Sequence, residues 1–153
     1  MKIRIEVESG LPENEVVIRC RELDSTVQKI QQYIAQACQS ANMIFYKDSA
    51  EYYLPLESIL FFETSPNGID AHTANDVFQT RHKLYELEEL LPLCFIRISK
   101  STILNVDHIY SIDRNLTSAA RVQFTHSHKQ VYVSRNYYKA LKTRIEERRN
   151  YHA

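Results

Sequence analysis

From Asn42 to Ser134 the chain consists largely of short apolar stretches separated by turn-forming residues. Runs of four to eight residues bounded by Pro, Gly, Asn, Asp or Ser are typical of β-strands. The expected strands span residues 43–47, 51–55, 58–63, 69–73, 76–80, 95–98, 108–113, 121–127 and 129–134. Ten tyrosines and six phenylalanines favour the same conformation, because aromatic side chains pack well on a pleated surface.

Two helices interrupt or follow these strands. Residues 81–92 place Leu84, Leu87 and Leu91 on one face, and Pro92 ends the pattern. Residues 134–151 form a basic amphipathic pattern at the end of the chain. The sequence therefore predicts a mainly β domain of the α+β class over residues 42–153, with short helices, antiparallel sheet and a C-terminal helix.

Residues 1–41 have a different texture. Residues 2–8 alternate strictly between charged and apolar side chains, which is typical of a half-buried strand, and residues 16–20 indicate a second strand. Residues 24–41 predict a helix with a capping box formed by Ser25 and Gln28. We expect an N-terminal β-β-α extension with a regulatory or dimerisation role, ending near residues 40–42.

Composition excludes several classes of protein. Two glycines are too few for a Gly-rich phosphate loop. No apolar run is long enough to span a membrane, and no signal peptide is present. The three cysteines, Cys20, Cys38 and Cys94, have apolar neighbours and no metal-binding spacing, so we expect buried free thiols in the reducing cytoplasm.

No group of residues makes a strong case for catalysis or for a cofactor. His126 and His128 lack a third metal ligand nearby in the sequence. Cys94 has no adjacent base to activate it, which favours a core thiol over a nucleophile. Glu86 and Glu89 lie one helical turn apart, as on a solvated helix face. We therefore expect a protein that is not an enzyme, with no metal, no cofactor and no small-molecule substrate.

The charges are unevenly distributed although their sum is zero. Residues 1–96 contain eight basic and fifteen acidic residues, whereas residues 97–153 contain eleven basic and four acidic ones. Such asymmetry favours a polyanion as the partner of the second half, although attraction between the two halves is an alternative explanation.

The stretch FIRISKSTILN, residues 95–105, combines apolar residues with a polar interruption. Ser99, Lys100 and Ser101 break a hydrophobic run, and an ordinary surface turn would more naturally use Gly, Asn or Pro. We interpret them as a short loop held between buried anchors, which presents one cation and two hydroxyls. Arg97, on the preceding strand, is expected to act as a structural ion-pair partner.

Several ordered blocks of the sequence resemble one known family. The segments LESILFFETSPN, KLYELEELL, FIRISKSTILNVDHIYSI and VYVSRNYYKAL occur in the order found in LytTR DNA-binding domains of bacterial transcription regulators. The resemblance covers about residues 42–145. Its most specific parts are the spacing of Phe95, Arg97, Ser101, Asn105 and Ile109 and the later Val-Ser-Arg before the last helix.

The resemblance implies an elongated antiparallel β domain that reads duplex DNA with loops in successive major grooves. It implies three contact regions: residues 65–68, residues 99–101, and Ser134 with Arg135. Lys100 and Arg135 are the expected base contacts. The expected further contacts, mainly with phosphates, are Ser99, Ser101, Ser134, Lys139 and His82. The first loop lacks the basic or histidine residue expected there, and Asn67 is its obvious substitute.

The resemblance also bears on regulation. A receiver domain does not fit into 41 residues, so phosphorelay control is not expected, and stand-alone relatives are often controlled by a membrane-protein inhibitor. We expect a homodimer on promoter repeats. The alternative hypothesis is a protein-interaction module with weak or no DNA binding. The operator, the target genes, the inducing signal and the sign of regulation are not encoded in any recognisable feature of the sequence.

Overall fold

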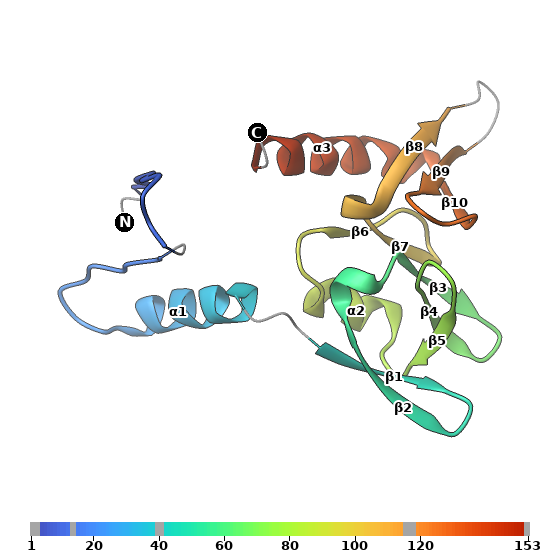
Figure 1. The fold of residues 1–153 in the computed structure, drawn as a ribbon, viewed down its shortest axis with the longest axis horizontal. Coiled ribbons are helices and arrows are strands. Elements are labelled where there is room, and N and C mark those ends of the chain that lie inside the picture. The colour runs from blue at the N-terminus through green and yellow to red at the C-terminus, as the bar shows by residue number, and fades with distance from the viewer. Residues whose placement is uncertain (1–3, 13–14, 39–41, 115–118, 152–153) are drawn as a thin grey trace. The chain divides into compact units, whose positions relative to one another are not determined.

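The computed structural model describes residues 4–12, 15–38, 42–114 and 119–151 (Figure 1). The chain divides into two units, Met1–Cys38 and Gln39–Ala153.

The first unit contains one helix, α1 (Ser25–Cys38). The backbone N–H of Val27 donates to Asp24 Oδ1 at 2.8 Å, so the residue that caps α1 is Asp24, and the predicted capping box at Ser25 is wrong. The two predicted N-terminal strands are also wrong, because none of the described residues 4–12 and 15–20 lies in a strand. Their apolar side chains are exposed and find no sheet to pair with.

The second unit contains ten strands, two short 3₁₀ helices and two α-helices among its described residues. In chain order they are β1 (Asn42–Lys47), β2 (Ala50–Pro55), η1 (Leu56–Ser58), β3 (Phe61–Ser65), β4 (Gly68–His72), β5 (Val77–Thr80), α2 (Leu84–Leu90), β6 (Phe95–Arg97), β7 (Thr102–Asn105), η2 (Val106–His108), β8 (Ile109–Asp113), β9 (Ala120–Phe124), β10 (Gln130–Val133) and α3 (Arg135–Tyr151). The mainly β class with short helices and a C-terminal helix is confirmed.

All strand pairs are antiparallel and form two sheets. The seven-stranded sheet has the order β2-β1-β5-β4-β3-β7-β6, and the three-stranded sheet has the order β10-β9-β8. One predicted strand is displaced: residues 56–58 form η1, whose Ser58 hydroxyl donates to the carbonyl of Pro55, and the strand begins only at Phe61.

Neighbouring residues on β3 and β7 fill two different cores. Phe61 pairs with Leu104 and packs in the cluster formed with the three-stranded sheet and α3. Phe62 pairs with Ile103 and packs on the other side, in the cluster that includes η1 and α2. Because successive side chains of a strand point to opposite faces, this one strand pair anchors both cores.

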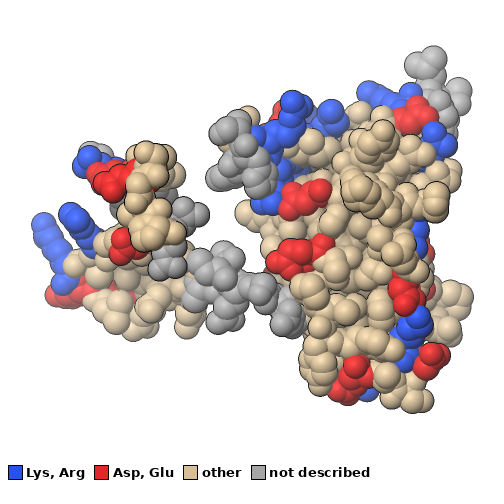
Figure 2. Space-filling view, in the orientation of Figure 1, with Lys and Arg blue, Asp and Glu red and all other residues tan. Residues whose placement is uncertain are grey.

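Helix α3 is fixed to the domain by its apolar and by its basic residues. Leu141 is fully buried, Arg144 Nη1 donates to the carbonyls of Leu93 and Phe95, and Arg148 pairs with Asp107 at 2.6 Å. Figure 2 shows Lys and Arg gathered over α3. Arg144 and Arg148 therefore stabilise the fold, so not every basic side chain of α3 is available to bind a ligand.

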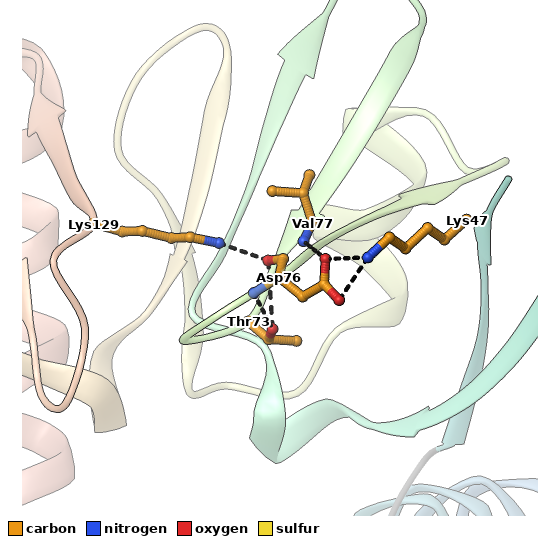
Figure 3. A network of polar contacts seen from close by, with 5 residues as sticks. All are labelled: Lys47, Thr73, Asp76, Val77 and Lys129. Carbon is orange, nitrogen blue, oxygen red and sulfur yellow. Dashed lines mark hydrogen bonds and ion pairs between the residues drawn. The ribbon is translucent and has the colours of Figure 1, made fainter.

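A polar network joins the loop between β9 and β10 to the seven-stranded sheet (Figure 3). Lys129 Nζ donates to the carbonyl of Asp76 at 2.6 Å, and Ser127 donates to the carbonyl of Ala74. The Asp76 carboxylate pairs with Lys47 Nζ at 2.6 Å, which holds the pKa of Asp76 below its usual value. The two sheets are thus connected by directional contacts at this end as well as by their apolar faces.

Asn105, at the end of β7, is buried, and its side chain makes two hydrogen bonds to backbone groups. Its side-chain Nδ2 donates to the carbonyl of Ile59 at 3.1 Å, and its Oδ1 accepts from the N–H of Asp107 at 3.1 Å.

The Asn105→Ala variant leaves both backbone groups without these partners, and we expect a loss of about 1–3 kcal/mol in the free energy of unfolding, measured in urea.

The matched control is Asn67→Ala, because Asn67 is exposed in a turn. We expect its free energy of unfolding to change by less than about 0.5 kcal/mol. Equal stability of both variants would contradict the structural role of Asn105.

Candidate nucleic-acid interface

The turn between β6 and β7 consists of Ser99, Lys100 and Ser101 and is held at both ends. Ile98 and Thr102 on either side are buried, and the N–H of Ile98 donates to the carbonyl of Thr102 at 3.0 Å. Within the turn, the N–H of Ser101 donates to Ser99 Oγ at 3.2 Å. Lys100 is exposed at the tip. The polar break in the apolar run is thus a short, anchored turn that presents one cation.

Arg97 holds this turn in place through its side chain. Its guanidinium forms an ion pair with Glu88 of α2 and donates to the carbonyls of Ser99, at 3.0 Å, and Lys100. The expectation that Arg97 is a structural ion-pair partner is confirmed. A planar guanidinium has several donors in fixed directions, so one side chain can tie α2 to two successive carbonyls of the turn.

Two backbone hydrogen bonds bring the other predicted regions to the same edge of the domain. The N–H of Thr64, in β3, donates to the carbonyl of Ser101 at 2.9 Å. The N–H of Ser134, just before α3, donates to the carbonyl of Ile98 at 2.9 Å. The end of β3, the β6–β7 turn and the start of α3 therefore adjoin one another, although they are far apart in sequence.

The β3–β4 connection is a two-residue turn of Pro66 and Asn67. Ser65 pairs with Gly68, whose φ of +128° is a conformation that only glycine adopts readily. Ser65 also donates to Asp70 Oδ1 at 3.0 Å. This tight turn leaves Asn67 exposed at its tip, with a carboxylate nearby and no basic residue of its own.

His82 lies beside that turn. A groove runs between the turn and residues 80–83, and both Asn67 and His82 line it. His82 Nδ1 lies 3.4 Å from Glu86 Oε2, so the imidazole already has an acidic partner within the protein.

The same groove is lined by two basic residues that the sequence interpretation missed, Arg81 and Lys83. Arg81 stacks over the Tyr46 ring at 4.2 Å, and both cations are exposed. The signal was present in the sequence as three consecutive basic residues, Arg81 to Lys83, immediately before α2.

The first turns of α3 contribute the remaining predicted residues. Ser134 is half-buried and precedes the helix, whereas Arg135 and Lys139 are exposed and lie about one helical turn apart. Arg135 has further contacts within the protein. Arg135 and Lys139, near the start of α3, are thus exposed, whereas Arg144 and Arg148 hold the helix against the domain.

The cysteine and metal predictions have mixed outcomes. Cys20 is exposed, so its predicted burial is wrong, while Cys94 is half-buried and desolvation raises the pKa of its thiol to about 11. The side chain of Cys38 lies outside the described part of the structure. Within the described ranges, no three His, Cys, Asp or Glu side chains gather where a metal would bind. In the same ranges, no helix has the length and apolarity needed to cross a membrane.

Comparisons with known proteins identify the family and the fold of this chain. The family model described as LytTr DNA-binding domain matches residues 49–146. Over 145 residues the chain is 28% identical to HTH-type transcriptional regulators of Staphylococcus aureus strains NCTC 8325 / PS 47 and COL, covering 95% of this chain and 98% of each relative. A solved LytTr DNA-binding domain from Bacillus cereus superposes with a TM-score of 0.64 at 21% identity, covering 70% of this chain and 98% of that one.

Fold and family together define a DNA-binding transcriptional regulator, and not an enzyme. The chain belongs to the LytTR family. In the described ranges each of the three α-helices is followed or preceded by strands, and no two α-helices are consecutive. The described part of the chain thus holds no helix-turn-helix pair, and its candidate interface is made of turns and a helix start.

The role of Arg97 can be tested without DNA. In Arg97→Lys a single ammonium replaces the guanidinium fork, so it cannot hold Glu88 and both turn carbonyls together. We expect faster amide hydrogen exchange in residues 99–102, measured by mass spectrometry, with unchanged exchange in β10.

Lys100→Ala is the control, because Arg97 contacts only the backbone of Lys100 and its side chain is exposed. Exchange in this variant should match that of the unaltered protein. If Arg97→Lys also leaves exchange in residues 99–102 unchanged, Arg97 does not hold the turn.

Proposed function

We propose that this protein binds duplex DNA sequence-specifically by inserting the β3–β4 turn, the β6–β7 turn and the start of α3 into successive major grooves. The convergence of these three segments at one edge carries the proposal. Each is fixed by the fold: the first by a two-residue turn, the second by Arg97, and the third by the Ser134–Ile98 hydrogen bond. Loops that the fold already holds in place lose less conformational entropy on binding than mobile loops do.

Base contacts are assigned to the exposed cations at the tips of two segments. Lys100 and Arg135 each donate to guanine O6 and N7, the acceptors that distinguish a G·C pair in the major groove. Asn67, at the tip of the first turn, has an amide that pairs with adenine N6 and N7. The β3–β4 turn has no basic residue, so this segment reads bases while adding little electrostatic attraction to the DNA.

Phosphate contacts are assigned to polar side chains beside those tips. They are Ser99, Ser101, Ser134, Lys139 and His82. Hydroxyls, ammonium groups and imidazoles fix the register on the duplex without reading its sequence. Arg81 and Lys83 border the groove that contains His82, so they add positive charge along the same stretch of backbone.

In the cell, we propose, the protein acts in the cytoplasm as a homodimer on promoter repeats. Two half-sites read by two copies gain affinity through effective concentration, without new contacts in either half-site. A repeat therefore suits a small domain whose individual interface offers few base-reading side chains.

A second candidate function is a protein-interaction module, for example one that binds a membrane-protein inhibitor. The specific observation that favours it is the acidic character around the first turn, where Glu63 and Asp70 are neighbours across β3 and β4. In this case the exposed apolar side chains of the first unit would contact the partner, and DNA binding would be weak.

The base-contact assignment is tested by mobility shift on a site obtained by selection from genomic DNA. We expect Lys100→Ala and Arg135→Ala each to weaken specific binding by about 5- to 150-fold, since a good base contact contributes about 1–3 kcal/mol. Discrimination against the mismatched base at the contacted position should fall in parallel.

Lys142→Ala is the matched control, because Lys142 is an exposed cation on α3 beyond its first turns. It should change affinity little and specificity not at all.

The salt dependence separates the two candidate functions: several phosphate contacts make affinity fall steeply as salt rises. Affinity that is weak, insensitive to salt and equal in all variants would favour the interaction module.

A further inference from the structure

Residues 4–8 have an unused strand-forming pattern. Ile5 and Val7 are apolar and are 84% and 92% exposed, and they alternate with Arg4, Glu6 and Glu8. Within the described ranges this segment belongs to no sheet, and the ion pair between Arg4 and Glu6 at 2.8 Å joins two exposed side chains. A segment that alternates in this way has one apolar face, which needs both a neighbouring strand and a cover.

A hairpin with residues 15–20 of the same chain does not meet this need. The register that matches apolar residues places Ile5 opposite Ile18. It also places Glu8 opposite Glu15 and Arg4 opposite Arg19, and like charges directly opposite one another destabilise a strand pair. Charge therefore disfavours the intramolecular hairpin that the sequence pattern first suggests, in accord with the absence of strands from the described residues 4–12 and 15–20.

The same segment is self-complementary when it meets a second copy of itself in the antiparallel direction. With Ile5 opposite Ile5 of the second copy, Arg4 lies opposite Glu6 of the second copy, and Glu6 opposite its Arg4. In this register every cross-strand charge pair is of opposite sign.

We propose that the segment around Ile5 pairs with the same segment of a second copy of this chain in an isologous antiparallel strand pair, in which residues 4–6 lie opposite residues 6–4 of the second copy. A two-fold axis through the pair repeats each contact, as closed dimers require. A two-stranded ribbon alone is marginal in water, so it needs an apolar cover. Helix α1 carries Val27, Ile30 and Ile34 on one side, each half-buried, and supplies a face of the right character from the same unit.

This dimer deepens the proposed function, because it names the interface that links two DNA-binding domains. Its existence does not depend on DNA binding, and it is tested on the full chain with no DNA present. The measurement is sedimentation equilibrium, which gives the dimer dissociation constant directly.

Single charge reversals should break the pair, and their combination should restore it. In Arg4→Glu the register places two acidic residues opposite each other, and in Glu6→Arg two basic ones. We expect each variant to raise the dissociation constant about tenfold or more, since two symmetry-related pairs change from attraction to repulsion. An equimolar mixture of the two variants should dimerise again, and so should the double variant R4E/E6R.

Arg19→Glu is the matched control, because it reverses an exposed arginine in the other N-terminal segment. It should leave the dissociation constant unchanged. Loss of dimerisation in Arg19→Glu alone, a monomeric wild-type chain, or failure of the mixture to associate would each overturn the proposal. Circular dichroism of every variant checks that the fold is retained.

DNA binding by the same variants separates this inference from the proposed function. Binding to a single half-site should be unchanged in Arg4→Glu, whereas binding to a repeat should weaken. A wild-type dimer that binds no DNA would contradict the proposed function and leave the strand pair standing. A monomer that binds a half-site would overturn the strand pair and the proposed homodimer, and would leave the proposed DNA contacts standing.

Discussion

The pairing of β3 with β7 is the interaction on which the rest of the second unit depends. Two apolar residues in succession on each strand, Phe61–Phe62 and Ile103–Leu104, send side chains to opposite faces and so fill two cores from one ladder. A one-residue slip in this register would turn the two apolar side chains of the shifted strand to the wrong faces. The same ladder ends at Thr64 and Ser101, whose backbone hydrogen bond brings the first two candidate DNA-contacting turns together.

The candidate interface is thus held in place by contacts that also stabilise the fold. The guanidinium of Arg97, at the end of β6, pairs with Glu88 and donates to the turn that carries Lys100. Arg144 and Arg148 are likewise used within the domain, where they hold α3 against the β6 segment and η2. Charge counts alone overstate the basic surface available to a polyanion, because these arginines already have carbonyl or carboxylate partners. Lys100, Arg135 and Lys139 are among the basic residues that stay exposed.

The sequence predicted most elements of the second unit, because short amphipathic strands and their turns are specified locally. It failed where partners decide the outcome. The expected strands in residues 2–8 and 16–20 have the correct period but lack a compatible neighbour in the same chain. The resemblance alone assigns His82 to the phosphate contacts, and the groove that it shares with Arg81 and Lys83 exists only once the β3–β4 turn lies beside β1 and β5.

By itself the sequence determined the class of fold, the anchored turn of residues 99–101 and the family, since each depends on residues close together in the chain or on their order. Only the tertiary structure decided which charges are structural and which are exposed. It also decided that residues 65–68, 99–101 and 134–135 meet at one edge. The physical reason is that strand register and ion pairing join residues distant in sequence, such as Ile98 with Ser134, and local patterns contain no information about those distances.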